Sequence, residues 1–222
     1  MSLWIKICGN TSLKDAQLAA EAGADAVGFV FAPSLRRVTA AQVADLVPHL
    51  PTALEKIGVF VDAPFEEIEA TARAAALTGV QLHFDAAPEL HTRLRARFGP
   101  ALRILRVVHF DAGTAEQAEA MMQDANVDAV MMDSRTVTAV GGTGQAFDWS
   151  AASKSLFQNK DVRSRGRLVV AGGLTPHNVG EAVATLRPWG VDVVSGVEAS
   201  PGQKDADKVR AFIANARRAV LG

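Results

Sequence analysis

Short apolar runs, most of them rich in valine and isoleucine, recur along the whole chain. They occupy residues 3–7, 26–31, 56–61, 79–83, 103–108, 128–133, 167–173 and 191–196. None of them alternates cleanly between apolar and polar positions. Continuous apolar runs of this length are typical of strands that are covered on both faces, as in parallel sheets.

Stretches with a helical period separate these runs. They occupy residues 12–23, 39–50, 64–76, 87–99, 114–125, 147–157, 175–186 and 205–220. Ser12 and Thr39 are expected N-caps, with Asp15 at the capping-box position of the first helix. Pro64 and Pro176 are expected in the first turns of their helices, where proline is tolerated.

The alternation of strand and helix, repeated eight times without a long linker or a change in composition, predicts an α/β fold. We expect one (β/α)8 TIM barrel, a closed sheet of eight parallel strands, over residues 1–222 as a single domain. An open doubly wound sheet is the alternative, and it usually carries a G-x-G-x-x-G motif after its first strand. Here the first strand is followed by "CGNTS".

Charge and cysteine content narrow the class of protein. The formal net charge is −1 at pH 7, which indicates neither a nucleic-acid partner nor a membrane surface. A single cysteine among the 222 residues suits a reducing cytoplasm. No apolar stretch approaches the roughly 18 residues of a membrane span, and the N-terminus lacks a signal-peptide profile. We therefore expect a soluble cytoplasmic protein.

The loops at the carboxyl ends of the strands carry the active site in a TIM barrel. Unusual residues gather there in this sequence. Cys8 follows the first strand and is either a small buried hydrophobe or a group that does chemistry. Asp133 closes the sixth strand, as a helix cap or as a group in the barrel mouth. His83 ends the fourth strand, as a structural residue or a substrate contact.

Glycine-rich loops follow the last strands. Gly172 and Gly173 come after the seventh strand, and Ser195 and Gly196 after the eighth. Glycines let a backbone approach an anion closely, so these four residues together predict a phosphate site rather than simple tight turns. A further loop, with Gly142, Thr143 and Gly144, follows the sixth strand and either folds over a substrate or makes no ligand contact.

The loop after the second strand contains Arg36 and Arg37. They are either a solvated pair of charges or a fork for a substrate carboxylate. No histidine pair or acidic cluster has metal-ligand spacing, and P-loop and G-x-S-x-G patterns are absent, so we expect no metal and no cofactor. A thiol and a carboxylate facing a phosphate site suit paired proton transfers, as in isomerisation of a sugar phosphate.

Together, "KICGNT", "GADAVGFVF", "IGVFV", "VQLH", "GGTGQAFDW", "AGGLTPHNV" and "GVDVVSGVEASPGQKD" resemble the phosphoribosylanthranilate isomerase family of tryptophan biosynthesis. The resemblance implies an Amadori rearrangement of N-(5'-phosphoribosyl)anthranilate to 1-(2-carboxyphenylamino)-1-deoxyribulose 5-phosphate. It implies Cys8 as general base, Asp133 as general acid and Arg36 as the group that binds the anthranilate carboxylate. The expected partner is the small-molecule substrate, N-(5'-phosphoribosyl)anthranilate. We expect the protein to be a monomer, with a homodimer as the alternative.

The chain departs from the family pattern in three places. Arg36 matches when the alignment runs through "R-x-V-T", and Arg37 matches when it is counted from "GFVF". Phe84 replaces a usual glycine, and Val194 replaces a common serine. The assigned chemistry also needs tuning, since a free thiol has a pKa of about 8.5. For Cys8, either Lys6 or local dipoles favour the thiolate; the alternative is that Lys6 has a plain salt-bridge role. For Asp133, we expect the apolar barrel to keep the carboxyl group partly protonated.

Three other functions compete with this interpretation. The first is the aminoaldose isomerase of histidine biosynthesis, or a dual-substrate version of it. That chemistry uses two aspartates, and a cysteine after the first strand, here Cys8, argues against it. Indole-glycerol-phosphate synthase uses a lysine acid that has no evident counterpart here. A catalytically silent phosphate-binding barrel would not need both Cys8 and Asp133.

Overall fold

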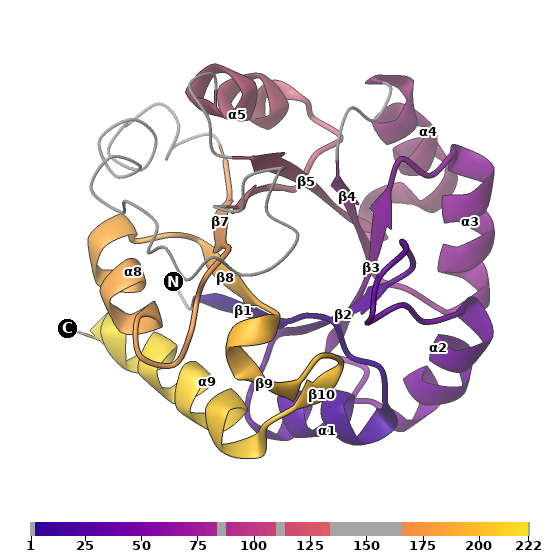
Figure 1. Cartoon of the computed structure of the whole chain (residues 1–222). Coiled ribbons are helices and arrows are strands. Elements are labelled where there is room, and N and C mark those ends of the chain that lie inside the picture. The colour runs from indigo at the N-terminus through magenta and orange to yellow at the C-terminus, as the bar shows by residue number, and fades with distance from the viewer. Residues whose placement is uncertain (1–2, 84–87, 110–113, 134–165, 222) are drawn as a thin grey trace.

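The computed structural model describes residues 3–83, 88–109, 114–133 and 166–221. Parallel strands close into a barrel in the order β1-β2-β3-β4-β5-β6-β7-β8, so each strand pairs with its neighbours in sequence and β8 pairs with β1 (Figure 1). The strands are β1 Trp4–Ile7, β2 Ala26–Val30, β3 Glu55–Val61, β4 Gly79–His83, β5 Arg103–His109, β6 Ala129–Asp133, β7 Leu168–Ala171 and β8 Gly190–Val193. The predicted closed parallel barrel is confirmed.

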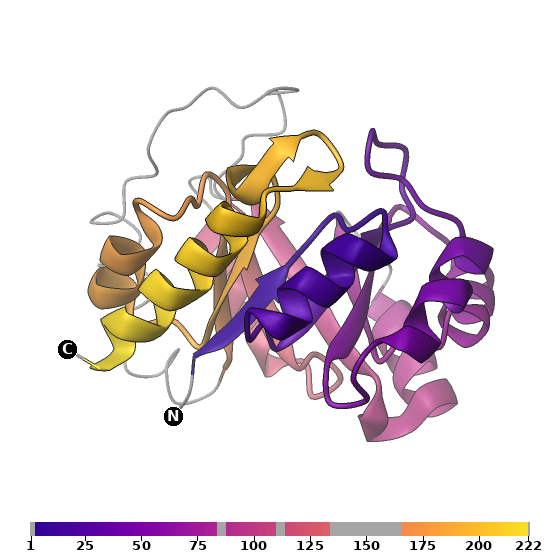
Figure 2. The same ribbon diagram turned by 90° about the horizontal axis from the view of Figure 1, so that it is seen from below.

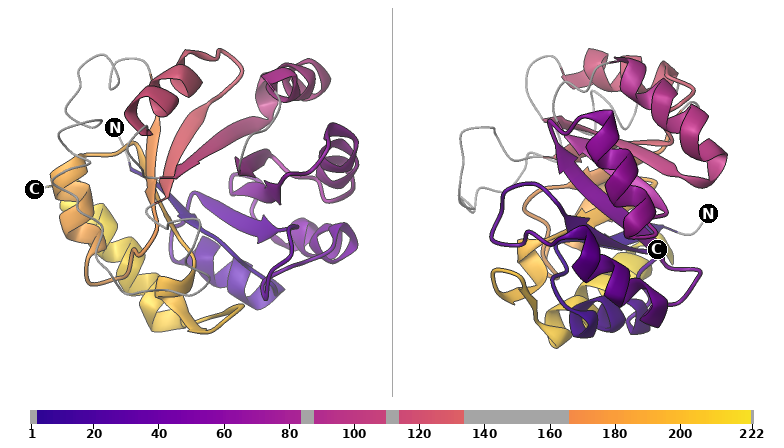
Figure 3. Two further views of the ribbon diagram at one scale, coloured as in Figure 1. Left: turned by 45° about the horizontal axis from the view of Figure 1, so that its top comes forward. Right: turned by 90° about the vertical axis from the view of Figure 1, so that its right-hand side faces the viewer.

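Helices surround the barrel as an outer ring (Figures 1 and 3). They are α1 Leu13–Glu21, α2 Ala40–Leu46, α3 Phe65–Ala74, α4 Pro88–Phe98, α5 Thr114–Gln123, α8 Val179–Leu186 and α9 Ala206–Leu221. Short 3₁₀ turns extend this set, η1 at Val47–His49, η2 at Gly99–Ala101 and η4 at Ser195–Val197. Within the described ranges, no helix is both long and apolar enough to cross a membrane.

Apolar side chains pack on both faces of the barrel wall. The interior holds one cluster, which includes Ile57, Leu105 and Met131. A larger cluster fills the layer between the strands and the helices. At the amino-terminal end of the strands, the indoles of Trp4 and Trp189 stack with ring centroids 5.1 Å apart. This end is therefore closed by packing, which leaves the opposite end for function.

Local signals placed two helix starts correctly and two incorrectly. Ser12 and Thr39 cap α1 and α2, and Thr39 completes a capping box with Gln42. Pro64 is the N-cap of α3 rather than a first-turn residue. Pro176 lies in a turn before α8, which begins only at Val179, because the chain after β7 first makes a loop whose amide at Thr175 binds the Asn178 side chain.

A small antiparallel hairpin follows β8 and was not predicted. Its strands are β9 Glu198–Ser200 and β10 Gln203–Lys204, with Gly202 at φ +81° in the turn between them. The hairpin projects from the end of the barrel opposite the start of β1 (Figure 2). The predicted helix at 147–157, the loop residues Gly142, Thr143 and Gly144, and Phe84 lie outside the described residues.

Candidate active site at the carboxyl ends of the strands

Cys8 lies directly after β1 with its side chain inside the barrel. The residue is 2% exposed, and its backbone amide donates to the Val193 carbonyl of β8. A Cβ placed on Gly28 of β2 would stand 2.4 Å from the Cys8 Sγ. The thiol therefore fits only because β2 carries a glycine at this level, a requirement that sequence analysis missed.

A buried ion pair lies beneath this thiol. Lys6 Nζ is 2.7 Å from Asp192 Oδ1, and both side chains are almost completely buried. Burial raises the pKa of the Cys8 thiol, because a thiolate inside the barrel loses its hydration. The Lys6 ammonium opposes this shift without cancelling it, while the Asp192 carboxylate adds to it. Lys6 thus has both roles that the sequence suggested, as a salt-bridge partner and as a cation that favours the thiolate.

Hydrogen bonds connect Lys6 to the end of β4. Lys6 Nζ donates to Gln81 Oε1 at 2.9 Å, and Gln81 Nε2 lies 3.0 Å from His83 Nε2. Since an amide NH₂ group only donates, this geometry makes His83 Nε2 the acceptor of a neutral ring. His83 is half-buried at the barrel mouth, as predicted, and is linked to the interior through Gln81.

Asp133 is the last residue of β6 and is 4% exposed. Ala129 and Met131 of the same strand belong to the barrel-interior cluster, so the alternation of side chains directs Asp133 inward as well. Cys8 and Asp133 therefore extend from different sides of one barrel mouth, since β7 and β8 separate their strands on one side of the ring.

The structure distinguishes the two adjacent arginines. Arg37 is exposed and forms a backbone bridge with Val30. Arg36 instead lies over the backbone after Cys8, because a Cβ on Gly9 would stand 2.8 Å from the Arg36 Cδ. This position favours Arg36 over Arg37 as the residue that faces the site.

The Arg36 guanidinium forms a two-pronged ion pair with Glu198 of the hairpin. Its Nε and Nη2 donate to the two carboxylate oxygens at 2.7 and 2.6 Å. Hydrogen bonding to Glu198 raises the pKa of Arg36. Burial acts to raise the pKa of Glu198, but Arg36 and Lys204 outweigh it and hold that pKa below its usual value.

The loops after β7 and β8 are in direct backbone contact. A Cβ on Gly196 would stand 1.9 Å from the Leu174 carbonyl oxygen, so only glycine allows this approach. Gly173 has φ +64°, and the space that its Cβ would enter is open. Asn178 holds the first loop by accepting from the Thr175 amide and donating to the Gly173 carbonyl. The glycines at 172, 173 and 196 and Ser195 are thus gathered at one place, as a phosphate site requires.

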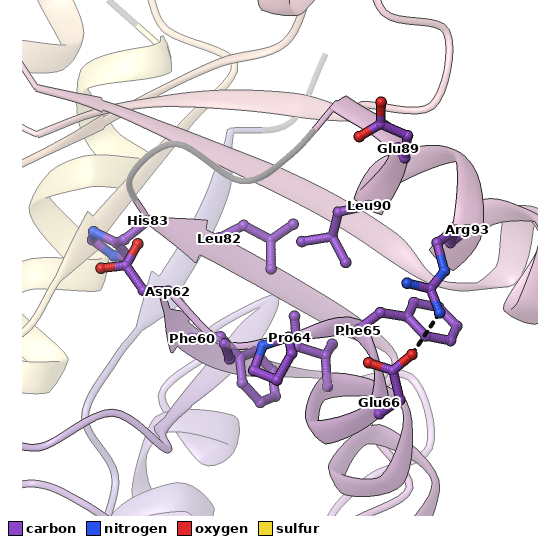
Figure 4. Close-up of a pocket in the computed structure, with 12 residues that line it drawn as sticks. Phe60, Asp62, Pro64, Phe65, Glu66, Leu82, His83, Glu89, Leu90 and Arg93 are labelled. Atoms are coloured by element: carbon purple, nitrogen blue, oxygen red, sulfur yellow. Dashed lines mark hydrogen bonds and ion pairs between the residues drawn. The ribbon is translucent and has the colours of Figure 1, made fainter.

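A cavity of about 440 Å³ lies between the ends of β3 and β4 and helices α3 and α4. His83 and Asp62 lie at one end of it, and the Glu66–Arg93 ion pair at the other (Figure 4). Of the predicted site residues in the described ranges, only His83 lines it. The cavity is therefore a neighbour of the barrel mouth, and neither Cys8 nor Asp133 lines it.

Sequence analysis missed several residues of the site. Asp192, Gln81, Glu198 and Lys204 are all buried polar groups that face Cys8, Lys6 or Arg36. Glu198 and Lys204 stand within a quoted motif, and the intervening Pro-Gly pair is a turn signal that could have indicated a hairpin. Among the described residues, no group of three histidine, cysteine or acidic side chains gathers closely enough to hold a metal ion.

Comparison with known proteins identifies the family. A family model described as N-(5'phosphoribosyl)anthranilate (PRA) isomerase matches residues 5–215. The chain belongs to this family. It is accordingly an aldose–ketose isomerase of tryptophan biosynthesis.

Relatives in the PRA isomerase family match the chain over nearly its full length. The N-(5'-phosphoribosyl)anthranilate isomerase of Pelobacter propionicus is 43% identical over 94% of this chain and 93% of its own. The crystal structure of phosphoribosyl anthranilate isomerase from Thermotoga maritima has a TM-score of 0.83 at 37% identity, covering 97% of this chain and 99% of that chain. A crystal structure of phosphoribosyl anthranilate isomerase in complex with reduced 1-(o-carboxyphenylamino)-1-deoxyribulose 5-phosphate has a TM-score of 0.79 at 35% identity, covering 97% of this chain and 99% of that chain.

Proposed function

We propose that this chain converts N-(5'-phosphoribosyl)anthranilate into 1-(2-carboxyphenylamino)-1-deoxyribulose 5-phosphate, with Cys8 as general base and Asp133 as general acid. The observation that carries the proposal is a buried thiol and a buried carboxylate at one barrel mouth, beside Arg36 and the glycine loops. The reaction needs no external oxidant or reductant, because it moves hydrogen within one molecule.

The first step opens the sugar ring. Asp133 donates a proton to the ring oxygen, while the lone pair of the anilino nitrogen expels that oxygen from C1'. The products of this step are a C4' hydroxyl and an iminium at C1'. A carboxyl inside the barrel mouth, at 4% exposure, is shielded from water in the way that an acid of this kind requires.

The second step removes the C2' proton. The Cys8 thiolate accepts it, and the electron pair of the C–H bond neutralises the iminium to give an enolamine. The Cys8 thiol then protonates C1', and the Asp133 carboxylate accepts the proton of the C2' hydroxyl, so that the ketone forms and both groups return to their starting states. Since burial raises the pKa of Cys8, only a minor fraction is thiolate near neutrality, and the Lys6 ammonium increases that fraction.

The remaining groups hold the two ends of the substrate. Arg36 binds the anthranilate carboxylate, and the backbone of Gly172, Gly173, Ser195 and Gly196 binds the phosphate. Holding both ends places the C2' carbon between Cys8 and Asp133. This fixed position of the reacting groups lowers the barrier to reaction.

Complementation tests the function directly. The gene should rescue a tryptophan auxotroph that lacks this step and should leave a histidine auxotroph that lacks the analogous aminoaldose isomerase unrescued. Purified protein should then turn over the anthranilate substrate. Rescue of the histidine strain alone would contradict the proposal.

Removing the Lys6 charge should shift the pH profile of the reaction. In Lys6→Met the thiolate loses its nearby cation while Asp192 still repels it, so the pKa of Cys8 rises further. The ascending limb of kcat/KM should therefore move to higher pH. At pH 7, kcat/KM should fall about tenfold for each unit that the limb moves. Lys14→Met, an exposed change on α1, should leave the profile unchanged.

A double variant separates this charge effect from a loss of stability. Lys6→Met alone leaves Asp192 buried without its partner, which costs about 3–5 kcal/mol of folding free energy. Lys6→Met with Asp192→Asn removes both charges, so the stability should recover in part. The ascending limb of kcat/KM should still lie at a higher pH than in the unmodified protein. An unmoved limb in a folded double variant would refute the role of Lys6.

Adding a side chain at Gly173 should weaken phosphate binding. In Gly173→Ala the new methyl group enters the open space beside the loop, where the proposal places the phosphate. The Kd of a ribose-5-phosphate analogue, measured by calorimetry, should rise about tenfold or more, the equivalent of one lost hydrogen bond of about 1.4 kcal/mol. Gly99→Ala, at φ +68° with equally open space, carries the same backbone strain at the end of α4 and should leave this Kd unchanged. Equal binding by both variants would place the phosphate elsewhere.

A further inference from the structure

Glu198 occupies one edge of the Arg36 guanidinium and leaves the other edge available. Its carboxylate accepts from Nε and Nη2 at 2.7 and 2.6 Å, which is the side-on geometry of a two-pronged pair. Within the described part of the chain, Nη1 donates no hydrogen bond. The outer edge, formed by Nη1 and the second hydrogen of Nη2, therefore remains for a substrate carboxylate.

The position of Glu198 is itself fixed. The side chain is 4% exposed, against 20% for the side chain of Arg36. Its Oε1 accepts from the Gly202 amide and from Lys204 Nζ, both at 3.2 Å, so the β9–β10 turn holds the carboxylate. The flexible, partly exposed arginine is thus bound to a rigid buried partner.

Lys204 balances the charge of Glu198. Its ammonium donates to three acceptors, the carbonyls of Cys8 and Val194 and the carboxylate of Glu198, at 2.6, 3.2 and 3.2 Å. Three well-placed acceptors for three N–H donors are what a buried ammonium requires. Arg36 and Lys204 carry two positive charges against one negative charge on Glu198. One positive charge therefore remains for an incoming carboxylate.

The same lysine connects this cluster to the general base. Lys204 Nζ binds the carbonyl of Cys8 itself, and the Arg36 side chain covers Gly9, the next residue. A shift of the hairpin would therefore move the arginine and the backbone of Cys8 together.

From this geometry we propose that Glu198 is a positioning residue that presents the outer edge of Arg36 to the carboxylate of the substrate, with Lys204 anchoring it to Cys8. The inference rests on the proposed function. The site then selects phosphorylated aminopentoses whose amine substituent carries a carboxylate within reach of Arg36. Glu198 acts through Arg36 and has no role in proton transfer.

Two probes test the proposal: reduced 1-(o-carboxyphenylamino)-1-deoxyribulose 5-phosphate and the same compound without its carboxylate. In the unmodified protein, loss of the carboxylate should weaken binding about 10- to 100-fold, the worth of a hydrogen bond to a charged group. In Glu198→Gln this ratio should fall to about threefold or less, because an amide accepts only one of the two guanidinium donors. KM for the substrate should rise about tenfold or more, with kcat changed far less.

A matched control is available at the other end of the barrel. Glu55 makes the same side-on pair with Arg103, at 2.7 Å for both bonds. In Glu55→Gln, loss of the probe's carboxylate should weaken binding as much as in the unmodified protein, even if the melting temperature falls as far as in Glu198→Gln. Should Glu198→Gln fail to fold, Glu198→Gln with Lys204→Met leaves neither buried charge unpaired and should show the same collapse of the ratio.

Arg36→Met separates failure of the inference from failure of the proposed function. If Arg36→Met keeps the carboxylate ratio, the assignment of Arg36 is wrong, and the role of Glu198 is wrong with it. If Arg36→Met loses the ratio and the folded Glu198 variants keep it, only the positioning role is overturned. Loss of the ratio in both, with Glu55→Gln unchanged, supports the proposal.

Discussion

Replacing Cys8 with serine should leave the barrel folded and lower kcat by about 10²–10⁴-fold, the usual effect of removing a general base. Serine has nearly the size of cysteine and fits the same space against Gly28. Its hydroxyl, however, does not ionise at accessible pH, so no anion is available to accept the C2' proton. Steady-state kinetics on the purified variant measure the effect.

A second serine substitution controls for buried polarity. Ala16 of α1 is fully buried in the layer between helices and strands, away from the barrel mouth. Ala16→Ser also buries a hydroxyl, so it should lower the melting temperature and leave kcat near its original value. If Cys8→Ser instead keeps near-normal kcat, Cys8 is a packing residue and the proposed mechanism is wrong.

The fold was predictable because the strands of a closed parallel sheet have a simple sequence pattern. Every barrel strand is covered on both faces, so each appears as a continuous apolar run, and all eight runs correspond to strands. The boundary at α8 was wrong because Pro176 was taken as a first-turn proline. It lies in a turn in which the Thr175 amide donates to the Asn178 side chain, and the helix begins only at Val179. The hairpin was missed because strands of three and two residues are too short to show a period.

The location of the candidate site residues was predictable where it depends on the ends of strands, and less so where it depends on pairing between distant residues. Cys8 directly follows β1, and His83 and Asp133 end β4 and β6, so the topology alone brings them to one mouth. The ion pair of Lys6 with Asp192 joins residues 186 apart in sequence, and that of Arg36 with Glu198 joins residues 162 apart. Such partners depend on strand register and loop geometry, which a single sequence does not provide. The geometry that favours Arg36 over Arg37 was therefore not visible in the sequence.

Replacing Asp133 with asparagine should stop the reaction at a different step. The amide keeps the shape of the carboxyl group at the end of β6 but cannot deliver a proton to the ring oxygen. Ring opening should then limit the rate, and kcat should fall about 10²–10⁴-fold. Asp128, which accepts from the Ile104 amide and pairs with Arg95 just before β6, gives a matched control, since Asp128→Asn changes an aspartate at the other end of the same strand. That variant should lose stability and keep its chemistry.

Deuterium at C2' of the substrate distinguishes the acid from the base. In the Cys8→Ser variant the slow step should be cleavage of the C2'–H bond, so deuteration should slow it strongly. In Asp133→Asn the slow step precedes that cleavage, and the isotope effect on kcat should be much smaller. Both variants are compared with the unmodified enzyme under the same conditions. A large isotope effect in Asp133→Asn, with none in Cys8→Ser, would show that the two residues have the opposite roles, because the group whose loss exposes C–H cleavage is the group that removes the proton.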